Sequence, residues 1–363
     1  MPVRTGVGGI EIRTWYGLDP AEGTWGYPIR QQWGLRARQE MSPGLEDKLA
    51  FTVTATTSYQ EAAEVARKWG CEVDDSTLHG LTQRLGEVAE QQTQERLEIQ
   101  PEELTLPRAS AQLAIFMLDG WQARYRGPGW GKKKTKKKRV EWHEFKTGVF
   151  YWHDQSTGKS KGKGKRAVIE EKVVIGWQGE SPELGRRLHW EALRRGLGRA
   201  KWILVLGDGA HWIWNVAADR WAAAEELLDF YHASEHVWEL GRALFGEEQA
   251  QPWVEARLHE LRHGQEQKVL DLVADLSVPT GERGETVEKQ QTYFANNAGR
   301  INYEEIADRG WPIGSGAVES ACGGKQGRFK RRGQFWTSRG LGNLEALIGA
   351  RHNKHWDELW FPA

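Results

Sequence analysis

Two apolar runs constrain the fold more than any other feature of this 363-residue sequence. The first, Leu113–Leu118, is followed by Asp119-Gly120, and the second, Trp202–Leu206, is followed by Gly207-Asp208-Gly209. A run that is apolar at every position predicts a strand covered on both faces, as at the centre of an α/β sheet. We therefore predict an α/β fold with these two strands at the centre of its sheet.

The segments around these runs predict the rest of the sheet. Residues 141–152 and 166–177 alternate like antiparallel strands, residues 180–199 have the pattern of a helix, and residues 227–232 are interpreted as a further strand. If residues 180–199 form a crossover helix, the two apolar strands lie parallel and side by side.

Carboxylates at the ends of the two apolar strands then predict a metal site. Asp119 and Asp208 would share the sheet edge at which ligands bind in open α/β folds. Two carboxylates repel one another, and Mg²⁺ or Mn²⁺ offsets that repulsion. Glu319 follows the loop Gly314-Ser315-Gly316 and is our candidate for the third carboxylate of a two-ion site for phosphoryl transfer. Taken singly, each Asp-Gly step also fits a turn, and Glu319 also fits the surface of a helix.

Local signals divide the remaining chain. Ser42, Ser58 and Asp74 stand where N-caps would begin three helices, and Trp69-Gly70-Cys71 would form a tight turn before the third. This arrangement fits a helix-turn-helix, with a small helical bundle as the alternative. The expected segments are a β-rich lead-in (1–42), a helix-turn-helix-like DNA-binding domain (43–105), the first part of the catalytic core (106–232), a helical insertion (233–308) and the C-terminal helices of the core (309–363).

Charge is balanced overall and segregated locally. Lys and Arg number 50, as do Asp and Glu, but basic residues concentrate in residues 131–139, 159–166 and 325–332, which is typical of a polyanion-binding protein. Each block also fits a solvated loop. Some of the 20 tryptophans lie beside these blocks, where aromatic rings can stack on unpaired bases. Our candidate DNA-binding residues are Lys132, Lys133, Lys134, Lys136, Lys137, Lys138, Arg139, Lys325, Arg328, Lys330, Arg331 and Arg332.

Other classes of protein are excluded by composition. The two cysteines, Cys71 and Cys322, cannot form a disulfide framework or a four-cysteine zinc site. The longest apolar runs are far shorter than the roughly 20 residues of a membrane span, and the first thirty residues have no signal-peptide pattern. We expect a soluble protein of a reducing compartment.

Several motifs together resemble one enzyme family. They are "LDG" at 118–120, "GDGAHWIW" at 207–214, "DFYHASEHVW" at 229–238, "GWPIGSGAVESAC" at 310–322 and "GQFWTSRGLGNLEALIGARHNKHWDELW" at 333–360. In this order they resemble the DDE transposases, specifically the ISKra-type insertion-sequence transposases, over nearly the whole chain.

The resemblance implies a fold and a chemistry. It implies an RNase H-like core interrupted by an all-α insertion, with Asp119, Asp208 and Glu319 holding two Mg²⁺ or Mn²⁺ ions. Asp229 and His232 match a D-x-x-H motif that helps to shape the active site of related transposases. His232 is thus a candidate catalytic residue that orients the substrate or a carboxylate, although it also fits a core histidine.

The implied function is DNA transposition, in which phosphodiester hydrolysis is followed by strand transfer. The partners would be the terminal inverted repeats and a double-stranded target, bound by a homodimer. The resemblance also implies a cytoplasmic protein of a prokaryote, associated with the nucleoid. Two alternatives remain open, a catalytically decayed relative that only binds DNA and a metal-dependent hydrolase on the same core. Gly323, which stands where related sequences usually have Lys, favours the decayed relative.

Overall fold

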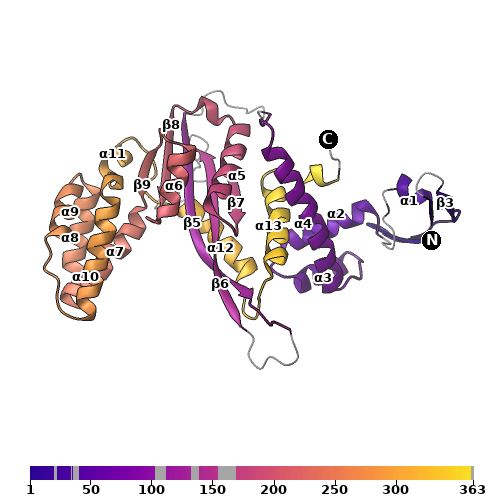
Figure 1. Ribbon diagram of the computed structural model, residues 1–363, viewed down its shortest axis with the longest axis horizontal. Coiled ribbons are helices and arrows are strands. Elements are labelled where there is room, and N and C mark those ends of the chain that lie inside the picture. The colour runs from indigo at the N-terminus through magenta and orange to yellow at the C-terminus, as the bar shows by residue number, and fades with distance from the viewer. Residues whose placement is uncertain are drawn as a thin grey trace. The chain divides into compact units, whose positions relative to one another are not determined.

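A computed structural model describes residues 1–19, 23–33, 35, 41–102, 112–131, 139–153 and 169–360 (Figure 1). The chain divides into two compact units. Unit 1 comprises residues 1–99, 123–143 and 324–363, and unit 2 comprises residues 100–122 and 144–323. Because each unit collects separated stretches of the chain, neither is a continuous segment, and the five segments expected from the sequence stay a prediction.

The protein is mixed α/β, and its main sheet has five strands in the order β7-β6-β5-β8-β9. Strand β8 pairs in parallel with both β5 and β9, whereas β6 and β7 are antiparallel. The predicted parallel pairing of the two apolar strands is confirmed, with Met117 opposite Leu206. The strands are β5 (Leu113–Arg126), β6 (Val140–Trp152), β7 (Val173–Trp177), β8 (Trp202–Gly207) and β9 (Glu225–Leu228).

Strand β5 does not end at the Asp119-Gly120 step, as the sequence suggested, but continues to Arg126. Its first six residues are all buried, whereas beyond Gly120 buried Trp121, Ala123 and Tyr125 alternate with more exposed side chains. The strand is therefore covered on both faces in its first half and on one face in its second. Asp119 lies where the pattern changes.

Two predictions around β9 were wrong. The short link expected after Asp208 contains helix α6 (His211–Arg220), and the strand expected at residues 227–232 ends at Leu228. Helix α7 (Phe230–Phe245) begins directly afterwards, with Asp229 as its N-cap. The apolar run at 227–230 therefore belongs to the end of a strand and the start of a helix, which a short run cannot distinguish by periodicity.

Helices cover the sheet and extend beyond it in unit 2. The predicted helix at 180–199 is α5 (Ser181–Arg194), which packs on β7 and α6 and is followed by the 3₁₀ turn Leu197–Arg199. The helical reading of residues 233–305 is confirmed: α7 and α10 pack together, and α8 and α9 pack beside them (Figure 1). The bounds are α8 (Ala250–Arg262), α9 (Glu266–Ala274), α10 (Glu282–Asn297), a 3₁₀ turn (Ala298–Arg300) and α11 (Tyr303–Asp308).

Unit 1 begins with two antiparallel hairpins and continues with helices. The three predicted caps are confirmed: Ser42, Ser58 and Asp74 each accept a backbone N–H of the first turn. The elements are β1 (Pro2–Thr5), β2 (Gly8–Glu11), β3 (Gly17–Asp19), β4 (Thr24–Gly26), α1 (Ile29–Gln32), α2 (Pro43–Ala55), α3 (Tyr59–Lys68), α4 (Asp75–Leu97), α13 (Ser338–His352) and the 3₁₀ turn Asp357–Leu359. Helix α12 (Gly316–Phe329) begins in unit 2 and ends in unit 1.

Helices α4 and α13 form the tightest crossing in unit 1. A Cβ atom at Gly86 would lie 2.1 Å from the backbone oxygen of Asn343. The Asn343 amide in turn donates to the backbone and side-chain oxygens of Gln83, at 3.1 and 3.0 Å. The two backbones therefore approach one another where α4 has no side chain.

No helix in the described parts of the chain combines the length and apolar character that crossing a membrane requires.

Candidate functional site

The register of β5 and β8 determines where the first two predicted carboxylates lie. Asp119 and Asp208 each come two residues after the paired Met117 and Leu206, so Asp119 lies in the middle of β5, level with Asp208 just beyond the end of the neighbouring parallel strand β8. The Asp208 carboxylate accepts the Ala210 N–H at 2.9 Å, and its backbone carbonyl accepts the Tyr293 hydroxyl at 2.8 Å. Helix α10 thus holds the turn after β8.

The two carboxylates influence one another electrostatically. Burial raises the pKa of Asp119 above its usual value and the nearby charge of Asp208 raises it further, whereas a hydrogen bond from the Cys322 thiol acts in the opposite direction. Neither carboxylate forms an ion pair with a lysine or arginine within the residues the structure describes. The charge of protonated His232 lowers the pKa of Asp119 and so offsets part of this repulsion. Because like charges are costly to hold together, the arrangement also fits an external cation.

Asp229 is fully buried and links two elements of unit 2. One carboxylate oxygen accepts the His232 N–H at 2.8 Å and so caps α7, while the other accepts the Ser315 N–H in the loop before α12. Burial by itself would raise the pKa of Asp229, but the hydrogen bonds from His232 and Ser315 bring it below its usual value. Asp229 therefore remains a charged acceptor that joins the start of α7 to the loop that leads to Glu319.

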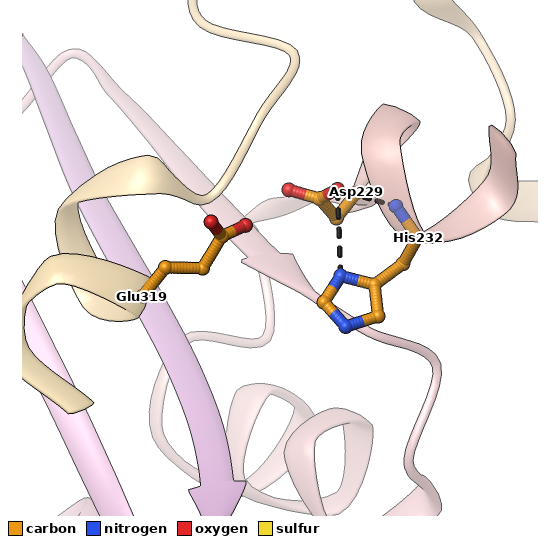
Figure 2. Close-up of side chains that lie close together, drawn as sticks. All are labelled: Asp229, His232 and Glu319. Carbon is orange, nitrogen blue, oxygen red and sulfur yellow. Dashed lines mark hydrogen bonds and ion pairs between the residues drawn. The ribbon is translucent and has the colours of Figure 1, made fainter. Parts of the chain in front are cut away.

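Glu319 and His232 lie on either side of this link (Figure 2). The Ser315 hydroxyl donates to Glu319 Oε1 at 3.2 Å, and His232 Nδ1 lies 3.6 Å from Asp229 Oδ1. The interaction with Asp229 raises the pKa of His232 to about 9. One ligand atom from each of Asp229, His232 and Glu319 lies within 4.8 Å of the others.

All four predicted catalytic residues lie in unit 2, but they are not equally close. Among the described residues, ligand atoms of Asp229, His232 and Glu319 lie close together, whereas those of Asp119, Asp208 and Glu319 do not all lie within 4.8 Å of one another. Asp119 is connected to the helix of Glu319 through Cys322, one turn later on α12. The three-carboxylate metal site stays a prediction, and its oxygen donors suit Mg²⁺ or Mn²⁺.

Sequence reasoning missed Cys322 and Tyr293 as supporting side chains of the site, and it identified Asp229 through the D-x-x-H motif but not as the N-cap of α7. Cys322 stands three residues after Glu319, a spacing that places both on one face of a helix, and this signal was available. Asp229 had an N-cap signal, because Asp followed by a helical pattern is typical of a helix start. Tyr293 had no signal, since its contact with Asp208 joins residues 85 positions apart.

The predicted DNA-binding residues have different surroundings. Lys132, Lys133, Lys134, Lys136, Lys137 and Lys138 lie outside the described residues, as does the block at 159–166. Lys325 is buried and forms an ion pair with Glu345, and Arg328 is buried and donates to the Thr57 carbonyl at 3.1 Å. These two side chains therefore contribute to the interior of unit 1. Four are partly or fully exposed, namely Arg139, Lys330, Arg331 and Arg332.

The exposed face of α4, the third helix of the predicted helix-turn-helix, is not basic. Its exposed side chains from Asp75 to Glu87 include Ser76 and His79 but no lysine or arginine, and Arg84 pairs with Glu46 at 2.7 Å. An open cavity of about 480 Å³ at the start of α4 is lined by Glu64, Arg67, Glu72, Asp74 and Asp75 among others. The helix-turn-helix stays a prediction, and the charge on this face does not favour entry into a DNA groove.

Comparison with solved structures finds the chain of a Drosophila P element transposase strand transfer complex. It is 9% identical, with a TM-score of 0.25, and the match covers 92% of this chain and 82% of that one.

Comparison with protein sequences gives a family. A Streptococcus gallolyticus protein described as "UPF0236 protein in vanSb 3'region" is 24% identical over 340 residues, which are 90% of this chain and 67% of that protein. The model of the family described as "Uncharacterised protein family (UPF0236)" matches residues 2–358. Because that match spans nearly the whole sequence, this chain is a member of the UPF0236 family.

Proposed function

We propose that the protein is a DNA transposase that hydrolyses phosphodiester bonds at the ends of a mobile element and transfers the freed strand ends to target DNA. The observation that carries the proposal is the parallel pairing of β5 with β8, which brings Asp119 in β5 level with Asp208 just beyond the end of β8. The Asp, Asp, Glu order along the chain and the contact between Asp119 and the helix of Glu319 support the same reading.

The architecture supports an RNase H-like core. The order β7-β6-β5-β8-β9, with an antiparallel pair on one side and parallel strands on the other, fits such a core. In this reading helices α7 to α11 are the insertion, because they lie in the chain between the last strand and α12, which carries Glu319.

The residues of the site would divide the work. Asp119, Asp208 and Glu319 would hold two Mg²⁺ or Mn²⁺ ions, which when bound activate a nucleophile and stabilise the charge on the reacting phosphate. Asp229 has both carboxylate oxygens engaged by backbone N–H groups, so its role is to position α7 and the Ser315 loop. Ser315 orients Glu319 through its hydroxyl. His232 has Nδ1 toward Asp229, which leaves Nε2 to bind a phosphate oxygen of the DNA (Figure 2).

The partners follow from this chemistry. The DNA would comprise the terminal inverted repeats of the element and a double-stranded target, and a homodimer would hold the two ends. The exposed basic residues Arg139, Lys330, Arg331 and Arg332 would contact phosphates, so binding should weaken as salt increases.

A nicking assay tests the proposal. The purified chain should nick supercoiled plasmid with Mg²⁺ or Mn²⁺, whereas Asp208→Ala and Glu319→Ala should abolish nicking. Glu255→Ala, which removes an exposed carboxylate from α8, is the matched control and should leave the rate unchanged.

The other outcomes separate the alternatives. No nicking by the parent, together with salt-sensitive DNA binding by all variants, would support a decayed relative that only binds DNA. Nicking without strand transfer on substrates that carry the element's ends would support a hydrolase.

A further inference from the structure

An exposed tryptophan in unit 1 lies among cations. Trp142 is on β6, and 54% of its surface is exposed. The Arg124 guanidinium and the Lys330 ammonium each lie 5.9 Å from the centre of its ring. An exposed tryptophan ring does not gain the stabilisation that burial would give it. The cations near the Trp142 ring would attract an anion, and the ring itself could stack on a flat aromatic group of that anion.

Hydrogen bonds join strand β5, which carries Arg124, to the turn after α12, which carries Lys330. The Trp336 N–H donates to the Arg124 carbonyl at 3.0 Å, and the Arg126 N–H donates to the Trp336 carbonyl at 2.8 Å. Arg124 also donates from its guanidinium to the backbone carbonyls of Lys330, at 2.7 Å, and Arg331. The turn after α12 is therefore attached to the second half of β5, so the position of its cations is defined.

Positive charge exceeds negative charge around the ring. The exposed or partly exposed cations on these segments are Arg124, Arg126, Arg139, Lys330, Arg331 and Arg332. Glu141 offsets part of this charge, since it lies 3.9 Å from Arg139 and 3.4 Å from His143, and Glu61 lies near enough to Arg331 to be influenced by it. The surface keeps a net positive charge and fits a phosphate backbone.

We propose that this surface, which we call the Trp142 platform, binds an unpaired stretch of DNA, with a base stacked on the Trp142 ring and neighbouring phosphates on Lys330, Arg331 and Arg332. The ring selects for unpaired DNA because the bases of a duplex already stack on one another and do not offer their faces. Aromatic stacking combined with a basic surface is the usual way in which proteins bind single strands without sequence preference. The inference rests on the proposed function, in that single strands arise when a transposase opens the DNA at its ends.

A binding experiment with the full chain tests the platform. Fluorescence anisotropy would measure the Kd for a labelled 20-nucleotide oligo-dT and for a duplex of equal length, with EDTA present so that no cleavage occurs. Trp142→Ala should weaken binding of the single strand about five- to hundredfold, as expected for the loss of one stacked base. Trp142→Phe, which keeps a flat ring, should restore most of the affinity, and duplex binding should change by less than twofold.

A second tryptophan provides the matched control. Trp202 in unit 2 is also exposed, and the Lys201 ammonium lies 5.6 Å from its ring centre, but it lies outside the basic turn at 330–332. Trp202→Ala should leave the Kd unchanged. An equal loss in both alanine variants, or a Trp142→Ala Kd within twofold of the parent while its thermal unfolding is unchanged, would overturn the inference. If Trp142→Ala proves unstable, Trp142→Leu, which fills much of the same space without a flat aromatic face, decides in comparison with Trp142→Phe. The platform requires the Phe variant to bind the single strand and the Leu variant to lose affinity for it.

The test separates this inference from the proposed function. A chain that nicks plasmid but binds single strands equally well with and without Trp142 overturns the platform alone. A chain that binds single strands through Trp142 but cleaves nothing with Mg²⁺ or Mn²⁺ overturns the transposase alone.

Discussion

A buried ion pair in unit 1 and the candidate site in unit 2 arrange their charged side chains in opposite ways. In unit 1, Lys325 on α12 pairs with Glu345 on α13, and both side chains are 7% exposed. In unit 2, Asp119 is partly buried near Asp208, a charge of the same sign, and no lysine or arginine of the described chain forms an ion pair with either.

The Lys325–Glu345 ion pair stabilises the fold, whereas the Asp119 and Asp208 carboxylates are held near one another at a cost in stability. In a buried pair of opposite charges each group compensates the other, and removing one partner destabilises the protein because it leaves an unpaired buried charge. Two carboxylates of the same sign cost stability, so an arrangement that keeps them together is typical of a functional site. The predictions below test this distinction.

The largest effect is expected from neutralising a carboxylate in unit 2. Asp119→Asn keeps the shape of the side chain and removes its charge, so DNA cleavage should fall by about a thousandfold or more, as when a group that stabilises transition-state charge is lost. The melting temperature should stay unchanged or rise, because a repulsion is removed. Plasmid nicking and calorimetry would measure the two effects, and a clear drop in melting temperature would assign Asp119 a role in folding.

In unit 1 the same kind of change should act on stability. Lys325→Met leaves Glu345 charged and buried, and should lower the free energy of unfolding by about 3–5 kcal/mol. The double variant Lys325→Met with Glu345→Leu should recover most of that loss, because a well-packed apolar pair can replace a buried ion pair. Urea unfolding would compare the three proteins, and equal losses in the single and double variants would contradict the account.

Asp229 lies between these two cases, because it is buried and charged and yet satisfied by backbone N–H groups. Asp229→Asn keeps only one acceptor oxygen, so it cannot accept the His232 N–H and the Ser315 N–H together. The link between α7 and the loop before Glu319 should therefore be lost. Cleavage should fall about 10- to 100-fold, the range for a group that orients metal ligands. Ser315→Ala keeps the N–H contact and removes only the hydroxyl contact to Glu319, so its loss should be smaller. A larger loss in Ser315→Ala would show that the hydroxyl matters more than the link to α7.

The smallest effect concerns packing without charge. Gly86→Ala places a Cβ against the Asn343 backbone and should destabilise unit 1 by about 1–3 kcal/mol, the usual cost of overpacking. Gly80→Ala in the same helix meets nothing within 4 Å and should stabilise by up to about 1 kcal/mol, because alanine favours the helix. Thermal unfolding of the two variants would measure the contrast. Shifts of the same sign would contradict the close crossing of α4 and α13.

Features that depend on neighbouring residues were predictable from the sequence. The caps at Ser42, Ser58 and Asp74 form within one helical turn. The apolar residues 113–118 and 204–206 are buried, as their composition requires, whereas Trp202 and Ile203 at the start of the second run are more exposed. Their parallel pairing followed from a single crossover helix, and it also brought Asp119 and Asp208 to the same edge.

Features that depend on distant partners were not predictable in this way. Lys325 belongs to a basic block that indicated phosphate binding, but Glu345 is located 20 residues later and only the packing of α12 on unit 1 reveals the pair. The compact group around Asp229 depends on where α7 begins. The apolar run at 227–230 predicted a strand there, so the start of the helix was not recognised. Local patterns cannot report which charged side chain a tertiary contact will bury.

The close crossing of α4 and α13 also has a consequence during synthesis. Leu78, Leu81 and Leu85 on α4 are buried in the folded protein, but α13, against which α4 packs, is translated some 240 residues later, from Thr337 onward. At about 5–20 residues per second, the ribosome needs on the order of 10–50 s to supply it. Helices α2 and α3, which precede α4 in the chain, can already cover part of it, but the face that packs on α13 stays uncovered through most of translation, and this is the interval in which chaperones acting on emerging chains would bind it.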